Sequence, residues 1–523
     1  MNSTQNGVRV PVFTKGDIGG ITYLVTNNIV NYIIVIFTLK NVLKWPDEIV
    51  YGRVIPGMSL GLLLGGLIYA YMGWRLAQRV GNSNVTALPS GVSTPAMFVI
   101  LYGVIMPLHY SLGDPEKVWS AAIAATFIGG FVEFIGGFIG PWIKNNLPRA
   151  ALLGTVAGIG FIWMATKGLF DVYSDPLIGL PILFIAMLGL FGGYMFPGKI
   201  PPLVVAIVGG IIYAYLLGRT HVDFSGVGFY FPNPVNVVES MINGFVIVTP
   251  YLTIIIPVEI YNFIETMDNV ESANAAGDDY NVRTTQFADG ICTMFSSLFG
   301  GVVPNTVWLG HSGLKKGGAG IGYSWISGLV LGLAGIFGLF TFLSALMPPA
   351  IAAITFLWCA TIMLSQAFKD TPVKHYAAIG IAMIPPVADF LYTQITGVLN
   401  ISETYTEVLP NGLPGYNSEV AAKIIENGAM WDGVPAVKSG AIIIGLLLAS
   451  AVVFIIDRRL DKVAYVSFVA AILSFFGFIH SASLGMYYKS EFVIGYVIIG
   501  VFAIIFHFSS KTWFEAEEDF EYV

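Results

Sequence analysis

The sequence predicts an all-α polytopic membrane protein that crosses the bilayer many times. Of its 523 residues, 55% are hydrophobic and only 11% are charged, and the mean hydropathy of +0.75 is too high for a soluble globule. A helix needs about 20 apolar residues to cross the hydrocarbon core, and runs of that kind recur from Ile21 to Phe508. Prolines and glycines interrupt two of these runs, which indicates irregular backbone inside the membrane.

The apolar runs divide into two sets of similar size. Seven predicted spans fall within 20–217 and seven more, of reversed orientation, within 244–457, so the sequence has the outline of an inverted 7+7 repeat. An external loop at 218–243 is expected between the repeats, and 458–509 is expected to form two extra C-terminal helices. The predicted spans are 20–43, 53–79, 86–107, 117–141, 147–168, 176–196, 200–217, 244–270, 284–301, 303–316, 319–347, 349–368, 373–398, 436–457, 462–482 and 490–509.

Basic residues predict the orientation, because cytoplasmic loops carry an excess of Lys and Arg. We therefore expect a cytoplasmic N-terminus at 1–19, an acidic cytoplasmic tail at 510–523 and an external acidic loop at 399–435, in a protein of the plasma or inner membrane. The net charge of −7 gives no reason to expect a nucleic-acid partner. The basic residues that fall on one side are Arg75, Arg79, Lys144, Arg149, Lys199, Arg283, Lys315, Lys316, Lys369, Lys374, Arg458 and Arg459.

The third and tenth predicted spans are too rich in helix-breaking residues to be ordinary helices. The third, TALPSGVSTPAMF, contains Pro89, Gly91 and Pro95, and the tenth, VVPNTVWLGHSGLK, contains Pro304 and Gly310. Each is expected to form an extended stretch followed by a half-helix. Because interrupted segments at matching positions of two repeats mark the binding site of many transporters, these segments predict a solute cavity near the membrane midplane.

The eighth span, YLTIIIPVEIYNFIETMDNVESA, carries carboxylates within apolar sequence. At about 100° per residue, one helical face carries Tyr261, Glu265, Asp268, Asn269 and Ser272. A carboxylate in a membrane span is costly and usually functional, and it can accept hydrogen bonds from a solute or exchange protons. Glu265 is the first candidate for solute contact, whereas Asp268 and Asn269 are candidates for coupling or structural roles.

The two broken spans supply further candidates for solute binding. His311 and Ser312 begin the tenth half-helix, where free N–H groups and the positive dipole end are expected, and histidine titrates near neutrality. Ser93 and Thr94 resemble a helix cap, and Gly91 would let a solute approach the backbone.

Several other residues complete the predicted site. Trp308 and Tyr261 could stack on a planar ring, and Asn27 is expected to face the pore from the polar first span. Asp289 and Glu133 are further intramembrane carboxylates, for which coupling or ties between helices are expected. Since no metal spacing, nucleophile elbow or phosphate loop occurs in the sequence, we expect no enzyme, no metal site and no cofactor.

Taken together, these motifs resemble the nucleobase/ascorbate (xanthine/uracil) permease superfamily, in particular its azaguanine-type purine permease branch. The resemblance covers most of residues 17–460. In the first half it rests on GDIGGITYLVTNNIVN, GRVIPGMSLGLLLGG and TALPSGVSTP, and in the second half on FIETMDN, FADG, FGGVVPNT and GHSG.

The resemblance implies fourteen core helices divided into a core and a gate domain, with short strands before the half-helices of the third and tenth segments. It implies transport of nucleobases with protons or sodium, often by dimers. The family's base-binding acidic residue of the eighth helix falls on Glu265. Its second acidic residue, in the tenth segment, is replaced by His311, which departs from the family pattern.

The sequence therefore predicts a secondary active permease that carries a nucleobase-like solute, purine first, by alternating access. Proton symport is the expected drive, with Na⁺ as the other coupling ion considered, and a homodimer is implied by the resemblance. One alternative is an anion carrier or exchanger of the same fold. Another is a channel or a membrane sensor that does not transport.

Overall fold

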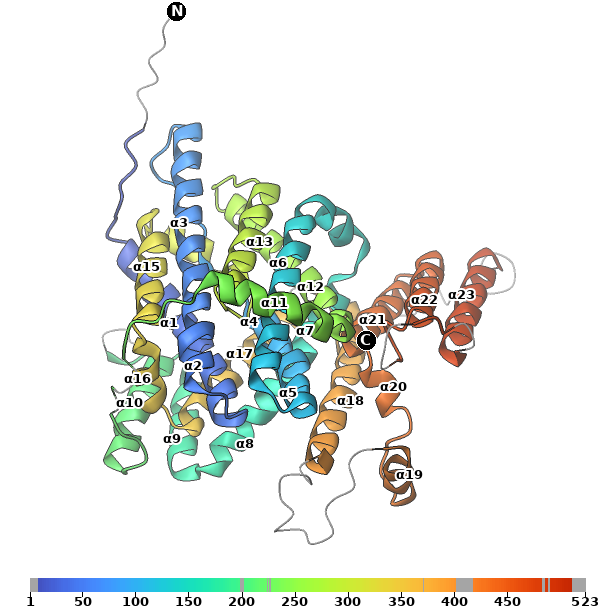
Figure 1. The fold of residues 1–523 in the computed structure, drawn as a ribbon. Helices are drawn as coiled ribbons and strands as arrows, with labels where there is room; N and C mark the ends of the chain where they lie inside the picture. Colours follow the sequence, from blue (N-terminus) through green and yellow to red (C-terminus); the bar gives the residue numbers. More distant parts are fainter. Residues whose placement is uncertain are drawn as a thin grey trace, which may run out of the picture. The chain divides into compact units, whose positions relative to one another are not determined.

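The computed structural model describes residues 8–509 apart from 198–201, 223, 225–226, 370, 401–416, 482–484 and 488–489. Helices dominate the fold (Figure 1). Within the described residues, nine helices are long and apolar enough to cross a membrane. The shorter apolar helices there are Pro176–Leu190, Pro202–Leu216, Gly322–Ile336 and Ala441–Ile456. The chain is therefore a multi-pass α-helical membrane protein, as predicted. The tail at 510–523 and most of the acidic loop at 399–435 lie outside the described residues.

The chain divides into two compact units. Unit 1 contains 1–143, 167–249 and 258–358, and unit 2 contains 144–166, 250–257 and 359–523. The elements of unit 1 include α1 (Asp17–Ile36), α2 (Asp47–Ile49), α3 (Ile55–Val80), β1 (Ser90–Val92), α4 (Thr94–Val99), α5 (Met106–Leu112), α6 (Pro115–Asn146), α8 (Thr166–Ser174), α9 (Pro176–Leu190), α10 (Pro202–Leu216), α11 (Pro234–Val248), α12 (Leu252–Ala275), α13 (Val282–Leu298), β2 (Asn305–Val307), α14 (His311–Lys316), α15 (Gly322–Ile336), α16 (Leu339–Ala345) and α17 (Pro349–Lys369).

The division between the units runs through α6, α12 and α17. Unit 2 also contains α7 (Arg149–Ile159), α18 (Tyr376–Asn400), α19 (Ser418–Glu426), α20 (Val434–Lys438), α21 (Ala441–Ile456), α22 (Leu460–Phe475) and α23 (Glu491–Ser509). In unit 2, Gly154 of α7 lies so close to α18 that an added Cβ would be 2.9 Å from the Cα of Ile379. A buried cluster including Val463, Ala470 and Ala503 packs α21, α22 and α23 together.

The predicted eighth span consists of two helices rather than one. α11 begins at Pro234, inside the expected external loop, because Asn233 caps it by accepting a hydrogen bond from the backbone N–H of Val235 at 3.0 Å. It ends at Val248, just before Pro250, which lacks the N–H that a continuing helix requires. After a short 3₁₀ turn, α12 carries the acidic residues of the predicted span.

The third and tenth segments form the predicted strands followed by half-helices. β1 pairs with β2 in antiparallel register, with Ser90 opposite Val307 and Val92 opposite Asn305. α4 then starts after Ser93, with a proline in its first turn, and α14 starts after Gly310, whose φ of 98° favours glycine. The same strand-then-helix unit thus occurs once in each half of the chain, as an inverted repeat predicts.

Glycines allow α3 to approach its neighbours closely within unit 1. A Cβ added at Gly66 would lie 2.6 Å from the carbonyl oxygen of Ser324 in α15, and one at Gly61 would lie 2.9 Å from Nδ2 of Asn305 in β2. Ser324 also donates a hydrogen bond to the carbonyl of Gly66 at 3.2 Å. The glycines of the motif GMSLGLLLGG therefore fix how closely α3 packs against α15 and β2.

We predict that Gly66→Ala lowers the stability of the detergent-purified protein by about 1–3 kcal/mol, because overpacking a tight helix contact has costs of that order. The matched control is Gly209→Ala in α10, where an added Cβ meets nothing within 4 Å. The control should keep the wild-type melting temperature or raise it slightly, since alanine favours helix. Equal melting temperatures for both variants would contradict the close packing of α3 on α15.

Candidate functional site

The candidate site is built around the paired strands β1 and β2, whose backbone is buried in unit 1. Beyond the paired residues, the N–H of Ser93 donates to the carbonyl of Pro304 at 3.0 Å, and the N–H of Trp308 donates to the carbonyl of Pro89 at 2.8 Å. These bonds extend the ribbon on both sides. A two-stranded ribbon still leaves outward-facing backbone groups unpaired, so other side chains must supply partners.

Asparagines of α1 supply partners for β1. Oδ1 of Asn28 accepts a hydrogen bond from the N–H of Val92 at 3.0 Å, and Nδ2 of Asn31 donates to the carbonyl of Val92 at 3.4 Å. Oδ1 of Asn31 in turn accepts from the hydroxyl of Thr94 at 3.1 Å. Polar residues of the first span therefore hold the third segment in its extended form.

One face of α12 supplies the partners for β2. Nδ2 of Asn262 donates to the carbonyl of Asn305 at 3.2 Å, the hydroxyls of Thr266 and Thr306 lie 2.8 Å apart, and Nδ2 of Asn269 donates to the carbonyl of Val307 at 2.6 Å. Asn269 was among the residues predicted from the sequence, whereas Asn262 and Thr266 were not. Their spacing of four and three residues was the available signal, because it places all three side chains on one helical face.

The neighbouring face of α12 carries Glu265 toward β1. Its Oε2 accepts a hydrogen bond from the hydroxyl of Ser93 at 3.3 Å. Within the described part of the chain no Lys or Arg forms an ion pair with Glu265, and the charged groups that act on it are Asp268 and Asp289. The structure thus brings Glu265 and Ser93 together at the point where β1 turns into α4.

Trp308 packs over β1 rather than standing apart from it. Its Nε1 donates to the carbonyl of Val92 at 2.8 Å, and its ring meets that of Tyr23 edge to face, with centroids 6.3 Å apart. A Cβ added at Gly91 would lie 2.4 Å from Cδ1 of this indole. Gly91 therefore makes room for Trp308. The backbone access for a solute at Gly91 stays a prediction.

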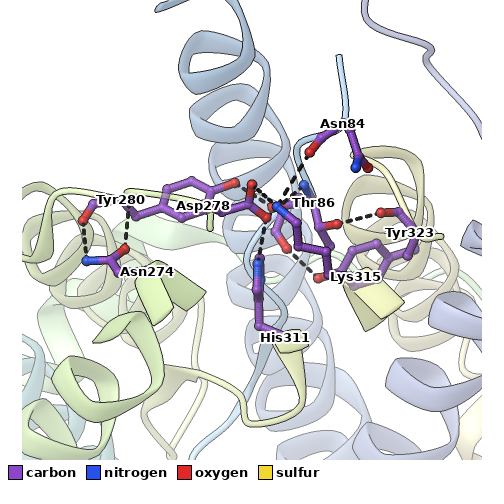
Figure 2. Close-up of polar contacts among 10 residues, drawn as sticks. Asn84, Thr86, Asn274, Asp278, Tyr280, His311, Lys315 and Tyr323 are labelled. Carbon is purple, nitrogen blue, oxygen red and sulfur yellow. Dashed lines mark hydrogen bonds and ion pairs between the residues drawn. The ribbon is translucent and has the colours of Figure 1, made fainter. Parts of the chain in front are cut away.

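His311 belongs to a separate polar network at the end of α12 (Figure 2). Its Nε2 lies 2.9 Å from Oδ2 of Asp278, and Nζ of Lys315 lies 2.5 Å from Oδ1 of the same carboxylate. The N–H of Thr86 also donates to Asp278 at 3.2 Å, and the hydroxyl of Tyr280 donates to the carbonyl of Thr86 at 2.7 Å. Asp278 thereby connects the loop after α12 with both broken segments.

This network determines the charge of Asp278. Burial raises the pKa of the Asp278 carboxyl, but hydrogen bonds from His311 and Lys315 outweigh burial and leave the pKa below its ordinary value. The carboxylate is therefore ionised at neutral pH. One ring nitrogen of His311 is engaged by it, while the other, Nδ1, has no hydrogen-bond partner among the described residues.

The remaining predicted residues are placed as follows. Nδ2 of Asn27 donates to the carbonyl of Tyr23 in its own helix at 2.7 Å, and Tyr261 is half-buried one turn before Glu265. Ser312 is half-buried beside His311. Asp289 accepts hydrogen bonds from Tyr69 at 3.0 Å and Thr266 at 2.6 Å, so it ties α13 to α3 and α12. Glu133 of α6 accepts a hydrogen bond from Asn262 of α12, and Asp268 of α12 is half-buried.

An open pocket of about 340 Å³ lies between α1 and α14. Glycines line most of it, with Tyr23 and Leu314, and neither Glu265 nor Ser93 is among its lining residues. The hydroxyl of Tyr23 donates to the carbonyl of Leu309 at 3.2 Å, so this residue connects the pocket with the segment that follows β2. The glycines are Gly16, Gly19, Gly20, Gly310, Gly313 and Gly317.

Comparison with known proteins gives a structural likeness only. No family model and no curated protein match the chain. The transmembrane domain of a cyanobacterium bicarbonate transporter, BicA, is similar with a TM-score of 0.51 and 16% identity, over 73% of this chain and 97% of that domain. SLC26A9 is similar over 71% of this chain and 69% of its own, at 16% identity and a TM-score of 0.41. The likeness to the BicA domain confirms the predicted inverted-repeat fold, and it does not specifically support the nucleobase permease branch.

We predict that Asp278→Asn destabilises the protein by about 1–3 kcal/mol at pH 7, the order expected when a buried charge-assisted hydrogen bond is lost. Because the folded-state pKa of Asp278 is depressed, its contribution is present above the unfolded-state pKa of about 3.9. The contribution is lost as pH falls through the folded-state pKa. The melting-temperature difference between wild type and variant should therefore shrink in acid.

Asp279→Asn is the matched control, because Asp279 is the next residue along the chain and its side chain is 84% exposed. Its Oδ2 lies 3.7 Å from Nη2 of Arg79. Its free energy of unfolding should lie within about 0.5 kcal/mol of the wild-type value, as is usual for surface substitutions. An Asp279→Asn variant as unstable as Asp278→Asn would show that the network around His311 contributes nothing specific.

Proposed function

We propose that this protein is a secondary active transporter for a small, neutral, nucleobase-like solute, and that Glu265 accepts hydrogen bonds from N–H groups of that solute. The observation that carries the proposal is the position of Glu265, a carboxylate in a membrane helix beside the paired strands β1 and β2. It accepts a hydrogen bond from the hydroxyl of Ser93, at 3.3 Å. A carboxylate costs at least about 2.5 kcal/mol at the centre of the bilayer, so its retention favours a functional role.

The charges around Glu265 favour a neutral solute with N–H donors over a bare anion. Asp268 and Asp289 are the charged groups that act on Glu265, and both are acidic. They would repel a second negative charge. His311, the residue that could have attracted an anion, has its Nε2 engaged by Asp278. A purine offers ring N–H groups to Glu265 and a flat face to an aromatic side chain such as Trp308.

The paired strands support alternating access as the mechanism. Broken segments at membrane depth place backbone groups and half-helices at a solute site, and movement of one part of the fold against another exposes that site to either side. We propose proton symport as the drive, since a carboxylate at the solute site can exchange protons, with Na⁺ as the alternative ion. Cytoplasmic termini and a homodimer remain predictions.

An anion carrier or exchanger is the second candidate, and one observation favours it. The solved structure reported above with a TM-score of 0.51 is the transmembrane domain of a bicarbonate transporter. At 16% identity that likeness carries the fold and not the substrate. Uptake measurements distinguish a transporter from a channel or a sensor. Saturable uptake with counterflow excludes a channel, and ligand binding without uptake indicates a sensor.

We predict that purines raise the melting temperature of the detergent-purified wild type and do not stabilise Glu265→Gln. A ligand at 100 times its dissociation constant stabilises the folded state by about 2.7 kcal/mol. The variant removes the charge that would accept N–H bonds but keeps the side-chain volume. Purines, pyrimidines, urate and small anions would be compared on wild type and variant by thermal shift.

The matched control is Glu271→Gln, an exposed carboxylate on the same helix, α12, which should keep the purine response. Stabilisation by bicarbonate or sulfate alone, equal in wild type and Glu265→Gln, would contradict the nucleobase proposal and favour the anion carrier.

A further inference from the structure

A second group of carboxylates lies in unit 1, apart from Glu265 and Ser93. Glu133 of α6 and Glu259 of α12 are both fully buried, as is Asn262. Nδ2 of Asn262 donates a hydrogen bond to Oε1 of Glu133 and another, at 3.3 Å, to Oε2 of Glu259. The same nitrogen lies 3.2 Å from the carbonyl oxygen of Asn305. One amide nitrogen with two hydrogens therefore faces three acceptors.

Among the residues that the structure describes, each member of this group also has a buried polar atom without a hydrogen-bond partner. These atoms are Oε2 of Glu133, Oε1 of Glu259 and Oδ1 of Asn262. Oε1 of Glu259 lies against α6, where a Cβ added at Gly129 would be 2.5 Å away. The hydroxyl of Thr293 from α13 is a further donor that acts on Glu133. Buried polar atoms are nearly always paired in folded proteins, and one hydroxyl and one amide are too few donors for the oxygens of two carboxylates.

The surroundings supply no positive charge within the described residues. No Lys or Arg there forms an ion pair with Glu133 or Glu259. The titratable groups that face the pair are Asp289 and Cys292 from α13 and Glu265 from α12. Tyr69 from α3 faces it through Asp289. Two neighbouring carboxylates in such a site cannot both stay ionised without a cation.

We propose that Glu133 and Glu259 form a proton-carrying site, with Asn262 as its positioning residue, and that this site is separate from Glu265. A proton from water forms an O–H bond on one of the two carboxylates and supplies the missing donor. The same O–H bond breaks when the proton returns to water on the other side, so no further reactant is needed.

The amide of Asn262 connects this site to the solute site. With a single proton shared between them, the two carboxyl groups still accept hydrogen bonds from Nδ2, as in the structure. When a second proton makes both groups neutral, they can donate instead, and the unpartnered Oδ1 of Asn262 becomes their acceptor when the amide turns over. That rotation would place Oδ1 against the carbonyl of Asn305 and break a bond that holds β2. Proton uptake would thereby loosen the strand that pairs with β1.

The presence of the proton is tested by infrared spectroscopy, independently of any transport activity. We expect the wild type at pH 7 to show the C=O stretch of a protonated carboxylic acid in a buried environment. Glu133→Gln and Glu259→Gln, made separately, should each reduce this band. The exposed Glu271→Gln on α12 should leave it unchanged. A band unaffected by both pair variants would overturn the proposal.

The coupling role rests on the proposed transport function and is tested in proteoliposomes with a purine as solute. Glu259→Gln should lose the stimulation of uptake by an inward proton gradient, measured as the ratio of gradient-driven uptake to counterflow. Glu265→Gln should instead lose purine binding altogether, so failure of the proposed function is a separate result. An unchanged gradient ratio in Glu259→Gln would contradict the coupling role even if purine transport is established.

Discussion

The antiparallel pairing of β1 with β2 is the interaction on which the rest of the structure depends. Extended backbone inside a membrane is tolerated only if its N–H and C=O groups find partners. The two strands satisfy one another on their facing edges, with Gly91 opposite Thr306. Asn28 and Asn31 of α1 and Asn262 and Asn269 of α12 satisfy the outer edges. The polar residues of both helices follow from this requirement.

The same requirement explains why acidic residues gather in this unit. Once α12 presents polar side chains to β2, Glu265 on its neighbouring face reaches Ser93, and Glu259 reaches Asn262 with Glu133. Asp289 joins through Thr266. Carboxylates without a cationic partner among the described residues therefore lie near the paired strands. Asp278, His311 and Lys315, by contrast, form a charge-compensated group beyond the end of α12. We assign solute and proton to the uncompensated carboxylates for this reason.

Much of the fold was predictable because its signals are local. Pro89, Gly91 and Pro304 marked the strands, and long apolar runs marked the helices. Glu265 stood out as a carboxylate in an apolar helix. The partner of His311 could not be predicted, since Asp278 lies in a loop without periodicity and 33 positions away. Asn262 was missed because an asparagine in a membrane span does not by itself indicate a role. Its role follows from its hydrogen bond to β2, which the sequence does not show. The start of α11 was missed because Asn233 and Pro234 lie in sequence expected to be a loop.

The central claim is that a solute binds beside the paired strands β1 and β2, against Glu265. An experimental density map of the protein with a purine bound tests this claim most directly. The account predicts density for the ligand within hydrogen-bond distance of the Glu265 carboxylate and close to Ser93 and Trp308. Ligand density in the glycine-lined pocket between α1 and α14, with no contact to Glu265, would contradict it.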